Sequence, residues 1–397
     1  MTTLSIVIPA YNEEKGIANI VQRVLAVRES LSQVGVTLKE LLVVDDGSRD
    51  KTAEIAGRID GVRLIRHPKN KGYGAALKTG FGHADSQLIG FLDADGTYPP
   101  EHFPQLCQAA LNGADLVVGS RMAGADSQMP LTRRVGNLFF ATLLSLITHQ
   151  RITDSASGMR VFKREILEQV YPLPDGLNLT PVMSTRAIHE GIRVAEVAIP
   201  YSERIGRSKL SVVRDGSIFL RSMVWTALTY NPVRILGLIG LMGMVVALLV
   251  GLWLLVLRLN GITNLGPWAI FTVFVGAVAG FSGVSLFSLG ITFNYLVSLF
   301  YKRPIRQGLF GRPLFKRPLD RQFWWLGGLL SLGGLGVGLT ATFFGLQGLG
   351  IDRLWLYFLG SAMFILIGLQ LIIYWVLLRV LDELSQRDVL TKQDLQP

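Results

Sequence analysis

The sequence has a single cysteine, Cys107, among its 397 residues. One cysteine excludes an intrachain disulfide and with it the class of small disulfide-stabilised domains. Acidic residues are also scarce in the C-terminal part. Residues 235–397 hold 12 basic but only 6 acidic side chains, whereas residues 1–234 hold 27 and 23. The net charge of +10 therefore divides into +4 before Ile235 and +6 after it.

Charge is missing altogether from long stretches of the C-terminal part. Ile235–Leu257 has no charged residue, and Arg258 is the only charge between Ile235 and Tyr301. A hydrocarbon core of about 30 Å is crossed by about 20 apolar residues in a helix. We therefore predict a transmembrane domain over residues 233–380, followed by a tail at 381–397. Its four spans are expected at about 235–257, 268–300, 323–351 and 354–378.

The basic residues of this part lie beside the apolar spans. A basic protein can bind nucleic acid, but this placement favours anionic lipid headgroups, and we expect no nucleic acid partner. The loop between the second and third spans contains one acidic residue, Asp320, and seven basic residues: Lys302, Arg303, Arg306, Arg312, Lys316, Arg317 and Arg321. Basic loops stay on the cytosolic side. Four spans then place both termini and the N-terminal part in the cytosol.

The N-terminus agrees with this orientation, because Leu4–Pro9 is too short for a signal peptide and follows no basic residues. The spans themselves contain no charge, whereas a transporter of polar sugars normally has some. We expect the spans to hold the protein at the bilayer and to help seat a lipid. Glycines recur in the third span and allow close helix packing, within the chain or in a homo-oligomer.

Residues 1–234 have the pattern of an α/β protein. Short apolar stretches at 4–8, 41–44, 62–66, 88–92 and 116–119 predict buried strands. They alternate with predicted helices at 15–32, from about 53, and at 75–84. This alternation indicates a mostly parallel, Rossmann-like sheet with helices on both faces. Ligands of such sheets bind beyond the carboxyl ends of the strands.

Polar clusters follow three of these strands, at Pro9–Glu13, Asp45–Ser48 and Asp93–Thr97. Asp93 and Asp95 stand two residues apart directly after a strand, so their carboxylates can converge on one hard cation. Mg²⁺ and Mn²⁺ favour such oxygen ligands and share them with phosphate and water. The cation would bridge a diphosphate and neutralise it as a leaving group. The alternative interpretation is an Asp-rich turn that caps the next helix.

The segments SIVIPAYNEE, VVDDGSRD, FLDADGTYPPE, VVGSR and SGMRVFKRE resemble the family 2 inverting glycosyltransferases with a GT-A fold. The most similar branch contains the dolichyl-phosphate mannose and glucose synthases and their bacterial polyprenyl-phosphate counterparts. The resemblance covers residues 4–230 and implies a GT-A domain over about 1–210. It implies a membrane-bound enzyme that transfers a sugar from a UDP- or GDP-linked donor to a polyprenyl phosphate, with inversion.

The resemblance also implies site residues on the donor side. The donor nucleotide would contact Pro9, Tyr11, Glu13, Val44, Asp46, Asp93, Ala94, Asp95, Arg204 and Lys209. Mg²⁺ or Mn²⁺ would bind Asp95 and Asp93, with Thr97 as a third ligand where mannose synthases often have Gln. Arg204 and Lys209 lie in a segment similar to Arg-x-x-Gly-x-Ser-Lys, in which Glu203 here occupies the first position. For Asp46 an Asx-turn into Gly47 is the alternative.

On the acceptor side, the resemblance implies that Arg121, Arg133, Arg134 and Asn137 receive the acceptor phosphate, and that Arg121 is catalytic with Asp93 and Asp95. Arginine suits this role because its planar cation binds two phosphate oxygens at once. The alternative for Arg133 and Arg134 is a solvated helix face. Asp154 would contact the acceptor or cap a helix. Many relatives have an acidic residue where this chain has residues 179–183, so we assign no base there.

Residues 211–232 predict an amphipathic helix. It combines apolar and aromatic residues with Arg214 and Arg221 just before the first span. This pattern is typical of a helix in the headgroup plane, and packing on the soluble domain is the alternative.

A phosphate acceptor is already an anion near neutral pH, so catalysis would depend on positioning and charge stabilisation. Diacylglycerol is an alternative acceptor, but its neutral hydroxyl would need a base. A processive polysaccharide synthase is another alternative, and the sequence lacks the Gln-x-x-Arg-Trp motif of those enzymes. A non-catalytic membrane scaffold or transporter that carries an inactive transferase domain is the third.

Overall fold

The computed structural model describes residues 1–123, 129–148, 150–202, 212–262, 264–301 and 319–394. The chain divides into two compact units, Met1–Ala227 and Leu228–Pro397. Each unit is described by itself.

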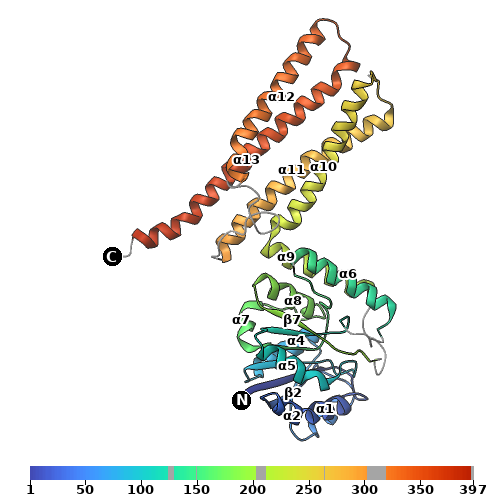
Figure 1. Cartoon of the computed structure of the whole chain (residues 1–397), viewed down its shortest axis with the longest axis vertical. Helices are drawn as coiled ribbons and strands as arrows, with labels where there is room; N and C mark the ends of the chain where they lie inside the picture. The colour runs from blue at the N-terminus through green and yellow to red at the C-terminus, as the bar shows by residue number, and fades with distance from the viewer. Residues whose placement is uncertain (124–128, 149, 203–211, 263, 302–318, 395–397) are drawn as a thin grey trace. The chain divides into compact units, whose positions relative to one another are not determined.

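The N-terminal unit is built on a seven-stranded sheet (Figure 1). The strands are β1 (Thr2–Ala10), β2 (Val36–Asp45), β3 (Val62–Arg66), β4 (Leu88–Phe91), β5 (Leu116–Ser120), β6 (Arg160–Lys163) and β7 (Val194–Ala198). Their order is β3-β2-β1-β4-β6-β5-β7, and only β6 runs antiparallel to its neighbours. The predicted mostly parallel sheet is confirmed. β6 and β7 were not predicted, because β6 has only two apolar residues between Arg160 and Lys163 and β7 is only partly buried.

The helices of this unit are α1 (Ile17–Ala26), α2 (Arg28–Gln33), α3 (Thr52–Gly57), α4 (Tyr73–His83), α5 (Phe103–Leu111), α6 (Leu131–Thr148), α7 (Leu167–Val170), α8 (Leu179–His189) and α9 (Val212–Tyr230). Short 3-10 turns stand at Pro100–His102 and Arg164–Ile166. The single helix predicted over 15–32 is two helices, because the chain leaves helical geometry at Val27, which packs in the core.

The core lies on both faces of the sheet, since successive side chains of a strand point to opposite faces. Ile6 and Ile8 of β1 pack on one face with residues of α1 and α5. Val7 packs on the other face with residues of α4 and α8. β1, β2 and β4 are parallel neighbours, so their carboxyl ends share one edge. The three polar clusters of the sequence therefore meet there.

The C-terminal unit contains α10 (Pro232–Leu259), α11 (Pro267–Tyr301), α12 (Phe323–Leu346) and α13 (Ile351–Asp394), preceded by a 3-10 turn at Leu319–Gln322. Within the described residues, these four helices are long and apolar enough to cross a membrane. α10 packs against α11, α12 packs against α13, and α11 also contacts α13.

The ends of the third and fourth helices differ from the prediction. α12 ends at Leu346 rather than at 351, and the turn that follows uses Gly348 with a φ of +96°. α13 begins at Ile351 and continues to Asp394, so most of the predicted tail is helical. The basic loop residues 302–318 lie outside the described residues.

Part of the glycine stripe in α12 serves the contact with α13. A Cβ on Gly327 would lie 2.5 Å from the carbonyl oxygen of Gly368, and one on Gly334 would lie 2.8 Å from that of Ser361. Gly328, Gly333 and Gly336 instead face open space. The close packing that we expected is therefore present within one hairpin.

Candidate active site

A cavity of about 480 Å³ lies at the carboxyl ends of the central strands. It brings together ten residues that the sequence predicted as site residues. They are Pro9, Tyr11, Glu13, Asp46, Asp93, Ala94, Asp95, Thr97, Arg121 and Asn137. The strand topology thus collects side chains more than a hundred positions apart around one volume.

Other predicted residues do not line this cavity. The side chain of Val44 is fully buried in the core with α4, because it alternates with Val43 along β2. Arg134 is exposed on α6 and is not part of the cavity wall. The side chain of Arg133, and all of Arg204 and Lys209, lie outside the described residues.

The two carboxylates after β4 are held by hydroxyl groups. Asp95 Oδ1 accepts hydrogen bonds from the backbone N–H of Thr97 at 3.1 Å and from its hydroxyl at 2.6 Å. Asp93 Oδ1 accepts a hydrogen bond from the hydroxyl of Tyr73 at 2.7 Å. The Thr97 side chain is almost fully buried, and its hydroxyl bonds to Asp95.

The donor set around Asp93 and Asp95 fits a hard cation that shares its ligands with a substrate. No group of three or more His, Cys, Asp or Glu side chains with metal-ligand geometry occurs among the residues that the structure describes. Two carboxylates are nevertheless enough for Mg²⁺ or Mn²⁺ when phosphate oxygens and water complete the coordination.

Asp46 is engaged by protein donors. Its carboxylate accepts the backbone N–H groups of Lys71 at 2.9 Å and Gly72 at 2.8 Å, and Nδ1 of His67 lies 2.7 Å from Oδ1. Nε2 of His67 is 2.9 Å from the hydroxyl of Thr79 on α4. The turn into Gly47 is instead stabilised by Asp45, whose Oδ1 accepts the N–H of Ser48. Asp46 therefore organises the loop that precedes α4.

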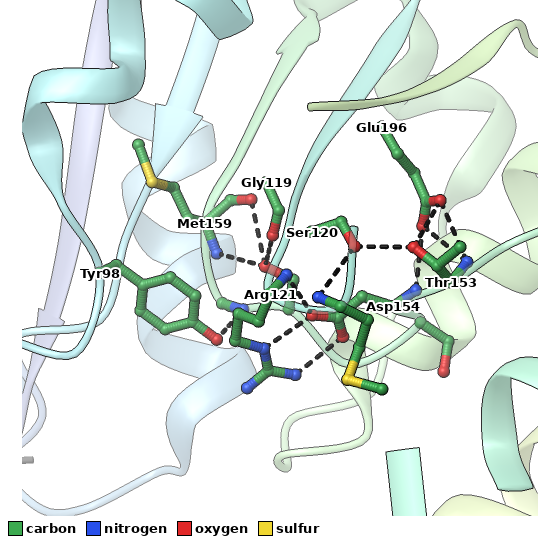
Figure 2. A network of polar contacts seen from close by, with 12 residues as sticks. Tyr98, Gly119, Ser120, Arg121, Thr153, Asp154, Met159 and Glu196 are labelled. Carbon is green, nitrogen blue, oxygen red and sulfur yellow. Dashed lines mark hydrogen bonds and ion pairs between the residues drawn. The ribbon is translucent and has the colours of Figure 1, made fainter. Parts of the chain in front are cut away.

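Arg121 forms a two-pronged ion pair with Asp154 (Figure 2). Its Nε and Nη2 donate to the two carboxylate oxygens at 2.7 and 2.8 Å, and its backbone N–H donates at 3.1 Å. Burial alone would raise the pKa of Asp154, but the charge and hydrogen bonds of Arg121 bring it below its ordinary value. Asp154 thus orients Arg121 and caps no helix.

The segment that carries Asp154 is fixed by Glu196 of β7 (Figure 2). The Glu196 carboxylate accepts the backbone N–H groups of Thr153 and Asp154, each at 2.9 Å. It also accepts the hydroxyl of Thr153 at 2.8 Å. Since β7 was not predicted, this support could not be expected from the sequence.

Two tyrosines flank the Arg121 guanidinium. Its central carbon lies 5.7 Å from the ring centre of Tyr98 and 5.6 Å from that of Tyr201, within the range of cation–π attraction. Burial raises the pKa of Tyr98, so its hydroxyl stays protonated. That hydroxyl accepts the N–H of Gly158 at 2.7 Å. The position of Tyr98 directly after the Asp-rich motif was the only sequence sign of this role.

Arg160 lies completely buried beneath the same loop. It donates from Nε to the carbonyl of Ser157 at 3.1 Å and from Nη2 to that of Ser155 at 2.9 Å. Burial lowers its pKa to about 10, which still leaves it a cation at neutral pH. Arg160 therefore holds the loop at residues 155–157 without reaching the cavity.

The opposite wall of the cavity is formed by α6, α8 and α9. Thr132, Asn137, Phe140, Thr180 and Phe219 line it. Asn137 is only 7% exposed, and neither its Nδ2 nor its Oδ1 has a hydrogen-bond partner among the described residues. Buried amides are normally paired, so this side chain is suited to bind a ligand.

Two family models match different parts of the chain. Residues 5–171 match glycosyl transferase family 2. Residues 232–392 match a domain of unknown function, DUF8752. The boundary between the two matches agrees with the division of the structure near Ala227.

Curated relatives extend the similarity. The chain is 32% identical over 221 residues to the dolichyl-phosphate hexose transferase of Haloferax volcanii, covering 56% of this chain and 92% of that protein. It is 31% identical over 299 residues to the undecaprenyl-phosphate 4-deoxy-4-formamido-L-arabinose transferase of Photorhabdus laumondii, covering 74% and 88%.

Among solved structures, glucosyl-3-phosphoglycerate synthase of Mycobacterium tuberculosis, crystallised with Mn²⁺, uridine diphosphate and phosphoglyceric acid, is 21% identical. The alignment covers 58% of this chain and 78% of that one, with a TM-score of 0.46.

Proposed function

Since this chain belongs to the family 2 glycosyltransferases, in their polyprenyl-phosphate branch, we propose that it transfers a sugar from a nucleotide-diphosphate sugar to a polyprenyl phosphate, with inversion. One observation carries the proposal. A single cavity gathers the acidic motifs of the strand ends, a pre-oriented arginine and a buried amide that has no partner among the described residues. The described part of the chain also contains four helices long enough to span a membrane.

The donor is assigned to the side of the cavity that β1, β2 and β4 form. Pro9, Tyr11, Glu13 and Asp46 would contact the nucleoside, and Arg204 and Lys209 would close over the diphosphate. Asp93 and Asp95 would hold Mg²⁺ or Mn²⁺, which when bound neutralises charge on the diphosphate leaving group. Hydrogen bonds from Tyr73 and Thr97 already orient these carboxylates, so little rearrangement is needed when the cation and the donor bind.

The acceptor phosphate is assigned to the opposite side, with Arg121 and Asn137 at the cavity and Arg133 and Arg134 at its approach. Arg121 keeps its orientation through Asp154, and the guanidinium is one of the cavity-lining groups. An acceptor phosphate oxygen would attack the anomeric carbon from the face opposite the leaving group. The attacking oxygen is already an anion, so the residues supply position and positive charge rather than a base.

An exposed apolar surface on the N-terminal unit supports a lipid acceptor. Leu131, Val135, Leu138, Phe139 and Leu146 form one exposed apolar stripe along α6, opposite the buried Asn137 and Leu144. α9 adds Ile218 and Trp225, also exposed, and Phe140 and Phe219 join the two helices at a ring distance of 5.9 Å. Exposed apolar helix faces with arginines at their edges are typical of the headgroup region.

We assign the catalytic unit and both termini to the cytosolic side, on the basic residues of the loop between α11 and α12 and of the segment around Arg214 and Arg221. Polyprenyl phosphate would then present its headgroup at the cytosolic surface, where nucleotide sugars are available.

The proposal is tested by incubating the purified full chain with a panel of UDP- and GDP-sugars and either a polyprenyl phosphate or diacylglycerol, with Mn²⁺ or with a chelator. Mass spectrometry identifies the lipid product. We expect one polyprenyl-phosphate sugar, formed only with a divalent cation and with inverted configuration. A product on diacylglycerol, or no lipid product with any donor, would contradict the proposal.

A further inference from the structure

The turn between β3 and α4 connects two acidic motifs of the cavity. The backbone N–H groups of Lys71 and Gly72 donate to the carboxylate of Asp46 at 2.9 and 2.8 Å. The hydroxyl of the next residue, Tyr73, donates to Oδ1 of Asp93 at 2.7 Å. Three consecutive residues thus contact two carboxylates that follow different strands.

The backbone around Tyr73 has little freedom to move. Gly72 has a φ of +107°, and a Cβ on it would lie 2.5 Å from the carbonyl oxygen of Asp175. The N–H of Ala75 donates to that same oxygen at 3.1 Å. The carboxylate of Asp46 accepts hydrogen bonds from this turn, and residues 174–176 pack closely against the same turn. These contacts fix the backbone that carries Tyr73.

The Asp93 carboxylate is also confined by the backbone at Gly158. A Cβ on Gly158 would lie 2.6 Å from Cγ of Asp93 and 2.7 Å from its Oδ1. The carboxylate therefore occupies space that only glycine at 158 leaves open. The N–H of Gly158 is bonded to the hydroxyl of Tyr98, which keeps this part of the loop in place.

We propose that Tyr73 is a positioning residue that fixes the rotation of the Asp93 carboxylate and thereby sets the affinity of the site for its divalent cation. This inference rests on the assignment of Asp93 and Asp95 to a cation in the proposed function. Hydrogen bonds from surrounding groups orient metal-ligating carboxylates, and their loss weakens metal binding on the order of 10-fold or more.

The test measures Mn²⁺ binding directly, from the free Mn²⁺ signal in electron paramagnetic resonance. The purified full chain is titrated with saturating UDP and, in parallel, GDP. Tyr73→Phe should raise the Mn²⁺ dissociation constant about 10-fold, while nucleotide affinity in the presence of a chelator stays at the wild-type value. Tyr171→Phe is the matched control, because Tyr171 is partly exposed and does not line the cavity, and it should change neither constant.

A second pair of variants separates positioning from general damage to the fold. In an Asp93→Asn background the carboxylate is gone, so adding Tyr73→Phe should not weaken Mn²⁺ binding further. An equal loss in both backgrounds would show a purely structural role and overturn the proposal, as would an unchanged Mn²⁺ constant in Tyr73→Phe.

The same titrations distinguish this inference from the proposed function. A wild-type chain that binds Mn²⁺ but transfers no sugar would end the proposed function, and the Tyr73→Phe shift would still decide the role of Tyr73. A wild-type chain that binds no Mn²⁺ with either nucleotide would overturn the positioning role itself.

Discussion

The two walls of the cavity differ in how their polar groups are satisfied. On the strand side, Asp46, Asp93 and Asp95 all accept hydrogen bonds from neighbouring protein groups. On the helix side, the buried amide of Asn137 has no partner among the described residues. The strand wall is therefore organised before any ligand binds, whereas the helix wall contains a group that a ligand would complete. This difference suits a donor that must be held rigidly and an acceptor that arrives from the bilayer.

The largest effect is expected from removing the carboxylate of Asp95. Asp95→Ala should lower kcat at least about 1000-fold, because charge stabilisation at the leaving group is lost. The fold should persist, since Asp95 accepts hydrogen bonds from its own turn at Thr97. Sugar transfer and circular dichroism measure the two effects, with Asp60→Ala on an exposed site as the control. Appreciable residual turnover in purified Asp95→Ala would refute the cation assignment.

A second prediction concerns the ion pair that holds Arg121, which Asp154→Asn removes. Asp154→Asn leaves the guanidinium buried without its counter-charge, which we expect to destabilise the N-terminal unit by about 3 kcal/mol. Activity should fall on the order of 100-fold, because Asn keeps only one of the two oxygens that accept from the Arg121 side chain and no longer holds the guanidinium in a two-pronged pair. Thermal unfolding and kcat are measured on the same preparation. Wild-type kcat in Asp154→Asn would contradict the role that we assign to this pair.

The carboxylates on the strand side of the cavity could be predicted from the sequence. Most of the residues that hold the site residues in position could not. Asp93, Asp95 and Asp46 follow apolar strands, so their common location follows from the parallel sheet alone. Thr97, which orients Asp95, is a local partner, but other supports of the site come from distant positions. Tyr73 reaches Asp93, and Asp154 reaches Arg121, only because the tertiary fold brings them together.

The predicted role of Val44 shows the opposite limit. The family resemblance implied that it contacts the nucleoside, and strand alternation turns its side chain into the core. The exposed stripe of α6 was missed because its apolar spacing is the same as that of a core-facing helix. Only the packing shows that Leu131, Val135 and Leu138 lie on the exposed side.

A third prediction sharpens the contrast between the walls. Asn137→Ala should raise the KM for polyprenyl phosphate about 10-fold while the donor KM stays unchanged, because a ligand contact is lost on the acceptor side only. Stability should not fall and should rise by up to about 1 kcal/mol, since a buried amide with no partner in the described part of the chain is removed. Gln105→Ala, at an exposed position on α5, is the control. A loss of stability with no change in acceptor KM would place Asn137 in the structural core.

The smallest effect on stability and activity is expected at Asp115. Its carboxylate is paired with protein groups and does not line the cavity. Asp115, before β5, accepts hydrogen bonds from Lys163 at 2.7 Å and from Nε of Arg193 at 3.2 Å. Burial alone would raise its pKa, but these bonds lower it to about 2 from an ordinary value of 3.8. A depressed folded-state pKa stabilises the fold above about pH 4, by less than about 1 kcal/mol because solvent screens this partly exposed group, and the gain is lost as the pH falls toward 2.

Asp115→Asn should therefore destabilise the N-terminal unit at pH 7, and the difference from wild type should shrink between pH 4 and pH 2. Sugar transfer at pH 7 should be unchanged, because Asp115 does not line the cavity. Unfolding of the two proteins measured at pH 7, 4 and 3 checks the pH dependence. A difference that stays constant down to pH 3 would mean that neutral hydrogen bonds, rather than the ionised carboxylate, stabilise this corner. Asp115 would then stabilise the fold through neutral hydrogen bonds, whereas the cavity carboxylates would act as charged groups.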